Sequence, residues 1–159
     1  YQNSYSKVKN NFIAWANKEF QVIEVFLFDT FGPDDYRNKV LDVFIKNLIK
    51  KTDINIPKSR IEINLTHVEE IVNCLHIAHK YPEGKYMIKS NNQLTIEELA
   101  KKIIKLNKEK VNIILGLNAI NFLQNIQFFP NNIYKKTLKI DFNSQLNQRI
   151  NEIRKADTI

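Results

Sequence analysis

The sequence feature that most restricts the possible folds is a seven-residue, mainly apolar segment, Val22–Phe28. It follows a helical pattern after a very short link, and Glu24 is its single charged residue. Near-continuous apolar strands of this kind occur inside parallel sheets, where both faces of the sheet are covered. A membrane-spanning helix needs about 20 apolar residues, so the segment is far too short to be one. It therefore predicts a strand inside a parallel sheet.

Helical and strand-like patterns alternate along the rest of the chain. The predicted helices cover residues 4–20, residues 36–50, two segments opened by the capping boxes Thr66–Glu69 and Thr95–Glu98, and a terminal segment capped by Asn143 or Ser144. Further strands are predicted at 61–65, 85–90 and 111–115, whereas residues 116–136 show no clear pattern. This alternation predicts an α/β fold.

The net charge of +7 raises the question of nucleic-acid binding. The basic residues are mostly lysines scattered along helix faces, and the arginines are only Arg37, Arg60, Arg149 and Arg154. Arginine is the residue that binds phosphates and bases through two parallel hydrogen bonds, so its scarcity counts against this class of partner. We expect solvated lysines and no nucleic-acid partner.

The remaining composition indicates a cytoplasmic protein without a membrane partner. Cys74 is the only cysteine, so no internal disulfide can form, and it lies in an apolar helical pattern as a small buried residue would. His76 and His79 lack a third ligand nearby, and we expect no metal site. No signal peptide is recognisable, and an opening Tyr1 in place of Met indicates a fragment.

Tyr5 and Lys9 form the pair with the clearest chemical meaning. At i and i+4 on a predicted helix, the two side chains share one face. A neighbouring ammonium favours the ionised phenol, which can then take a proton from a substrate hydroxyl. The spacing alone is weak, because Tyr81 and Lys85 repeat it in a segment broken by Pro82 and Gly84. Without further support, the spacing favours an ordinary polar face of a terminal helix over a catalytic pair.

The order of the following segments supplies that support. Tyr5-x-x-x-Lys9-x-x-Phe12 precedes a strand ending in the sequence Asp29–Pro33, DTFGP. Next come 35–39, DYRNK, then 63–70, INLTHVEE, and finally 84–99 with its capped helix. Over residues 4–107, this order resembles the extended short-chain dehydrogenase/reductase family. Within that family, it resembles the NAD-dependent sugar-nucleotide epimerases and dehydratases.

The resemblance implies roles for particular residues. Tyr5 would be the acid/base, and Lys9 would be its charged partner and a contact to the ribose of NAD or NADP. Asp29 stands where many members have Asn lining the sugar-nucleotide site. Lys39 matches a lysine near the substrate side of the cleft, with Arg37 as its neighbour. A nucleotide sugar would be the substrate, and the full enzyme could be a homodimer.

Several departures limit what this chain could do alone. Gly32, Gly84 and Gly116 are too far apart for a G-x-G-x-x-G loop, which a dinucleotide's diphosphate requires. The family's substrate-phosphate arginine is replaced by Ile63, for which Arg60 is an uncertain substitute. We therefore expect an isolated chain that is inactive: the C-terminal portion of an epimerase, dehydratase or reductase. The alternative is a non-catalytic remnant that acts as a basic binding or assembly module.

The expected architecture follows from this portion of the fold. Residues 1–35 would form the end of a Rossmann-like parallel sheet, comprising the catalytic helix and the strand after it. Residues 36–159 would mainly form a small mixed α/β lobe that binds the substrate, with segments of the two parts interleaved.

Overall fold

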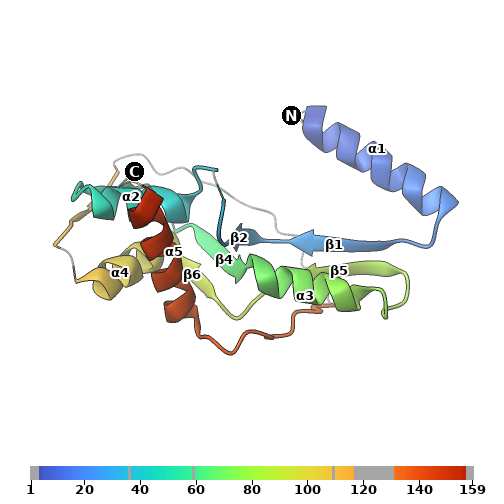
Figure 1. Ribbon diagram of the computed structural model, residues 1–159. Coiled ribbons are helices and arrows are strands. Elements are labelled where there is room, and N and C mark those ends of the chain that lie inside the picture. Colours follow the sequence, from blue (N-terminus) through green and yellow to red (C-terminus); the bar gives the residue numbers. More distant parts are fainter. Residues whose placement is uncertain (1–3, 36, 59, 109, 117–130, 157–159) are drawn as a thin grey trace.

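The computed structural model describes residues 4–35, 37–58, 60–108, 110–116 and 131–156 (Figure 1). Within these ranges the elements follow in the order α1 (Ser4–Glu19), β1 (Ile23–Leu27), β2 (Asp29–Phe31), α2 (Val40–Ile49), β3 (Ile54–Ile56), β4 (Glu62–His67), α3 (Val68–Ala78), β5 (Gly84–Ile88), β6 (Gln93–Thr95), α4 (Ile96–Asn107), β7 (Ile113–Leu115) and α5 (Phe142–Ala156). The predicted α/β class is confirmed.

The strands form three small sheets dominated by parallel pairing. β1 pairs with β5 in parallel, with Val25 opposite Tyr86. β4 lies between β2, its parallel partner, and β6, its antiparallel partner, while β3 and β7 form a separate parallel pair. The second edge of β5 is joined by a parallel bridge from Met87 to Asn132. The second edge of β1 has no strand partner among the described residues.

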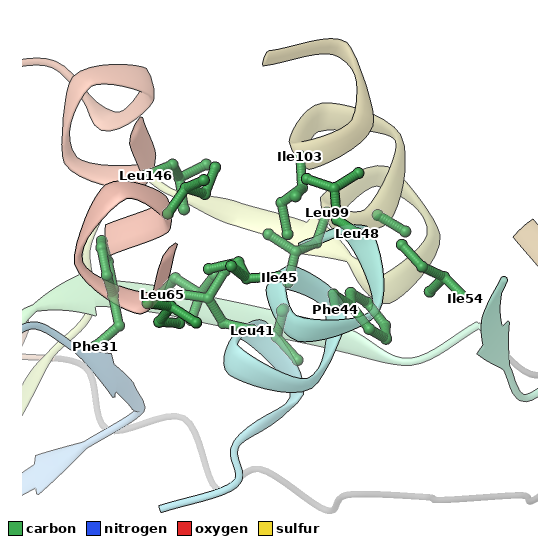
Figure 2. Close-up of a cluster of buried hydrophobic side chains, with 14 of the residues drawn as sticks. Phe31, Leu41, Phe44, Ile45, Leu48, Ile54, Leu65, Leu99, Ile103 and Leu146 are labelled. Atoms are coloured by element: carbon green, nitrogen blue, oxygen red, sulfur yellow. The ribbon is translucent and has the colours of Figure 1, made fainter. Parts of the chain in front are cut away.

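The main core lies where α2, α4 and α5 pack together over the strands (Figure 2). Its buried side chains are Phe31, Leu41, Phe44, Ile45, Leu48, Ile54, Ile56, Ile63, Leu65, Leu99, Ala100, Ile103, Leu146, Ile150 and Ile153. A second cluster joins α3 to β5 and the segment after residue 130, and it includes Ile71, Cys74, Ala78, Tyr86, Ile88 and Ile133. Cys74 is fully buried, as predicted.

Among α2 to α5, one helix start agrees with the sequence and three differ. Thr95 and Glu98 form the predicted capping box at the start of α4. Thr66 is instead buried in β4, and the cap of α3 is His67, whose Nδ1 accepts from the Glu69 N–H at 3.4 Å. The cap of α5 is Asp141, whose Oδ1 accepts from the Ser144 N–H at 2.7 Å. α2 begins at Val40, later than predicted.

The strand predictions were incomplete for a physical reason. Residues 22–28 were predicted as one strand, but β1 ends at Leu27, and β2 begins at Asp29 in a different sheet. β3 and β6 were not predicted, because strands of three residues are too short to show alternation. Most of the unpatterned stretch 116–136 lies outside the described residues.

α1 stands apart from the layers formed by the rest of the chain (Figure 1). Ala16 is its only buried residue. Tyr5, Val8, Phe12 and Trp15 are all more than half exposed, although helical spacing places them along one side of the helix. The helix therefore presents an apolar face that the described part of the chain leaves uncovered.

Candidate functional site

A pocket of about 290 Å³ lies just beyond the carboxyl end of β1. It is lined by Asp29, Thr30, Phe31, Asp35, Lys39, Val40, Leu41, Asp42, Leu65 and Arg149. The chain leaves β1 at Leu27 and enters the pocket wall at once through β2. In α/β folds, ligands bind outside the carboxyl ends of parallel strands, so the position alone marks this pocket as a candidate site.

Asp29 brings a carboxyl group to the lining of this pocket. Desolvation of its carboxylate raises the pKa, although the Lys39 charge and backbone N–H groups, including that of Asn64, oppose the shift. The lining also includes Phe31 and Leu65, two apolar residues of the main core. A carboxylate beside apolar surface is suited to accept hydrogen bonds from a hydroxylated ligand.

Lys39 lines the same pocket, but its ammonium is already bonded to oxygen atoms of the protein. Its Nζ donates to the Thr30 carbonyl at 2.6 Å and to Thr30 Oγ1 at 2.8 Å. It also lies 3.2 Å from Asp35 Oδ2. An ammonium has three donors, and these three oxygens use them. Lys39 is the N-cap residue of α2 and makes no side-chain cap bond, because an ammonium has no acceptor for a backbone N–H.

Arg37 lies outside this pocket and lines a neighbouring one of about 350 Å³, together with residues 30–35 and Val68. Its guanidinium makes two hydrogen bonds to the Asp35 carboxylate, at 2.8 and 3.0 Å. These bonds hold the pKa of Asp35 well below its usual range. Gly32 allows the loop to pass close to α3, because a Cβ there would collide with the Val68 side chain.

Tyr5 and Lys9 share a face of α1, as their spacing predicts. Lys9 Nζ lies 5.4 Å from the centroid of the Tyr5 ring. Tyr5 is 69% exposed, and neither residue lines the pocket that contains Asp29. The predicted site residues therefore fall into two groups: Asp29 and Lys39 at the pocket with Arg37 beside it, and the Tyr5–Lys9 pair on a separate helix.

Arg149, like its partner Asp42, is a charged pocket residue that the sequence did not single out. It is buried on α5 and pairs with Asp42, 107 residues earlier in the chain. Nothing local in the sequence indicates that partner. A signal for burial was present, because position 149 shares a face with the predicted core residues Leu146, Ile150 and Ile153.

Solved structures with this fold are numerous, although no protein-family model and no curated protein matches the chain. UDP-glucose 4-epimerase from Thermus thermophilus, solved with NAD, has a TM-score of 0.67 at 10% identity and covers 95% of this chain. UDP-glucose 4-epimerase from Thermotoga maritima, solved with UDP-glucose, has a TM-score of 0.71 at 12% identity and the same coverage. RMD from Pseudomonas aeruginosa, solved with NADPH, has a TM-score of 0.70 at 10% identity and covers 93%.

The fold is that of the C-terminal half of NAD-dependent nucleotide-sugar epimerases. The chain spans 52% of each UDP-glucose 4-epimerase and 54% of the Pseudomonas protein. The predicted resemblance is thus confirmed at the level of fold.

The glycines of this epimerase-like half do not fit the diphosphate of a dinucleotide. Gly32 packs against Val68, Gly84 lies beside the Tyr86 ring with φ +149°, and Gly116 faces the Ile56 carbonyl. None of these is a glycine-rich turn at a helix N-terminus. Across the described residues, no group of three or more His, Cys, Asp or Glu side chains could hold a metal ion. No helix in those same ranges has the length and apolarity to cross a membrane.

Proposed function

We propose that this chain is the substrate-binding portion of an NAD(P)-dependent enzyme that epimerises, dehydrates or reduces a nucleotide-linked sugar. The observation that carries the proposal is the Asp29 pocket at the carboxyl end of β1. Many functions can share one fold, so a function is inferred from the residues of a site and not from the fold alone. Structures with the fold that were solved with NAD and with UDP-glucose agree with the chemistry proposed.

In this proposal, the pocket receives the hydroxylated part of the substrate. Asp29 accepts hydrogen bonds from sugar hydroxyls, and Phe31 and Leu65 contact the apolar face of the ring. The nearby cations Arg37, Lys39 and Arg149 already contact carboxylates. A phosphate would have to compete with those carboxylates, so this pocket favours a neutral sugar over a diphosphate.

Tyr5 and Lys9 are proposed to supply the proton chemistry. Tyr5 would give or take a proton at its hydroxyl oxygen, and Lys9, whose ammonium lies 5.4 Å from the centroid of the Tyr5 ring, would be its charged partner. A cofactor-binding half that carries the glycine-rich loop would cover the exposed side of α1. It would also cover the edge of β1 that has no strand partner among the described residues. Residues 1–35 would then complete the sheet of that half, while 36–159 form the substrate lobe, with β5 interleaved.

The coding sequence directly upstream of Tyr1 tests this proposal. We expect it to encode a strand followed by a glycine-rich turn and a helix, as a dinucleotide site requires. In the polypeptide that includes both parts, Tyr5→Phe should abolish turnover of a nucleotide sugar while the protein stays folded. Unrelated sequence or a stop codon upstream, or full turnover by Tyr5→Phe, would contradict the proposal.

One observation favours a second candidate, a non-catalytic remnant of the fold that acts as a binding or assembly module. An assembled active site would require Tyr5 and Lys9 to line the same pocket as Asp29, and they do not. A basic binding module predicts salt-sensitive association with nucleic acid, whereas the enzyme portion predicts binding of a nucleotide sugar such as UDP-glucose. Measuring both on the same preparation separates the two candidates.

A further inference from the structure

The buried guanidinium of Arg149 connects three parts of the chain that meet at the pocket. Its Nε donates to Asp42 Oδ1 on α2 at 3.0 Å, and its Nη1 donates to Glu152 Oε2 on α5 at 3.3 Å. Its Nη2 donates to the backbone carbonyl of Asp35 at 2.8 Å, in the loop between β2 and α2. The residue is only 7% exposed, and a buried charge is stable only when it is paired in this way.

The hydrogen bonds continue from Asp35 to the pocket. The Asp35 carbonyl is fixed by Arg149, and the Asp35 carboxylate in turn contacts Arg37 and Lys39. Lys39 then bonds to Thr30, the residue next to Asp29. A connected path of polar contacts thus runs from Arg149 on α5 to Thr30. Thr30 is the neighbour of Asp29, the carboxylate proposed to bind the sugar.

Arg149 also lies between two hollows of the surface. It lines the Asp29 pocket on one side and a pocket of about 340 Å³ on the other. Asp35 and Asp42, two of its partners, line both pockets with it. Arg149 therefore contributes to the lining of both spaces together with two of its hydrogen-bond partners.

The loop that Arg149 holds adopts a conformation that needs support. Asp34 has φ +56°, in the left-handed region that residues with a side chain rarely occupy. Asp tolerates this region better than most residues, but other turns compete with it in a free chain. The bond from Arg149 to the adjacent Asp35 carbonyl favours the observed turn over those alternatives.

We infer that Arg149 is a positioning residue: it fixes the Asp35 loop, and through Asp35 and Lys39 it sets the wall of the Asp29 pocket. Lys39 then holds the Asp35 loop against β2 and does not contact the substrate. The resemblance had implied a place for it on the substrate side of the cleft. The nature of the ligand rests on the proposed function, but the positioning of the loop does not.

The carboxyl pKa of Asp35 reports this role in the chain without any ligand. We would measure it by carbon-detected NMR titration in the wild type, Arg149→Met, Arg149→Lys and the matched control Arg60→Met. Arg60 is an exposed arginine paired with Glu62 and does not line this pocket. We expect a pKa below the usual range in the wild type and Arg60→Met, and a rise of about one unit in both Arg149 variants.

A folded Arg149 variant with an unchanged Asp35 pKa would overturn the inference. If neither variant folds, the wild type supplies the test through its guanidinium signals. Three fixed bonds should give Arg149 separate, slowly exchanging Nη signals, whereas the Nη signals of Arg60 should be averaged. Averaged signals for both arginines would refute the fixed bonds of Arg149.

UDP-glucose titration of the same proteins adds the ligand. Weaker binding by Arg149→Lys than by Arg60→Met would support the positioning role at the pocket, and equal binding would contradict it. Failure of the wild type to bind UDP-glucose would count against the proposed function, while the Asp35 result would stand separately.

Discussion

α2 and α1 are both helices with an apolar side, but only one of them is covered. Leu41, Phe44, Ile45 and Leu48 of α2 are buried against α4, α5 and the strands. On α1, Phe12 is 62% and Trp15 51% exposed, and their rings contact each other instead of a core. The same kind of residue pattern thus has two outcomes within one chain.

The difference shows which part of the fold this chain completes by itself. Burial of apolar area contributes about 25 cal/mol per Å², and α2 gains this contribution from residues within the chain. α1 gains almost none of it. Large exposed apolar patches mark interaction surfaces in folded proteins. The body around α2 should therefore fold on its own, while α1 should depend on a surface supplied from elsewhere.

The largest expected effect is in the covered region. Leu48 is fully buried at the centre of the main core, so Leu48→Ala should lower the free energy of unfolding by about 2–5 kcal/mol. Val43 lies on the same helix but is partly exposed, so Val43→Ala is the matched control, with a loss below about 1 kcal/mol. Urea unfolding followed by circular dichroism measures both. Equal losses would mean that α2 is not buried as described.

A smaller effect is expected where α3 contacts the segment after residue 130. The Tyr134 hydroxyl donates to Glu70 Oε2 at 2.7 Å, and Glu70 is buried. Tyr134→Phe leaves that carboxylate without this donor and should cost about 1–3 kcal/mol at pH 7. Tyr5→Phe removes an exposed hydroxyl and should cost almost nothing.

The pH dependence of this difference gives a second test. Burial, with the Glu70 contact adding to it, raises the pKa of Tyr134 above its ordinary value of 10.0. Above that pH, the unfolded chain releases the phenol proton before the folded chain does, so the wild type loses stability. Tyr134→Phe cannot lose it in this way. The advantage of the wild type over Tyr134→Phe should therefore shrink as the pH rises above 10, and a constant difference would contradict the assignment.

Local patterns made the helices of the body predictable. The Thr95–Glu98 box and the apolar stripe of Leu146, Ile150 and Ile153 depend only on neighbours within a turn or two, and both are present. The order of motifs along the chain also predicted the fold. The bend after Leu27 that sends β2 to a different sheet depends on pairing with β4, and a single sequence does not specify such a partner.

The site was predictable in its residue types but not in their contacts. Asp29 and Lys39 do line one pocket. The sequence could not show that the Lys39 ammonium bonds to Thr30 and Asp35. Nor could it show that Arg149 lines the pocket and bonds to the Asp35 carbonyl, because that contact depends on how the loop and α5 meet. The predicted roles of Tyr5 and Lys9 stay predictions.

The smallest expected effect is on α1, and it sharpens the comparison most directly. Phe12→Ala removes a large apolar side chain, yet it should change the free energy of unfolding by less than about 0.5 kcal/mol, because the ring is mostly exposed. The same variant should reduce self-association of the chain in sedimentation velocity, since the exposed face is then smaller. Asn10→Ala, on the opposite side of the helix, should change neither. A loss near that of Leu48→Ala would instead show that α1 packs on the body of this chain in solution.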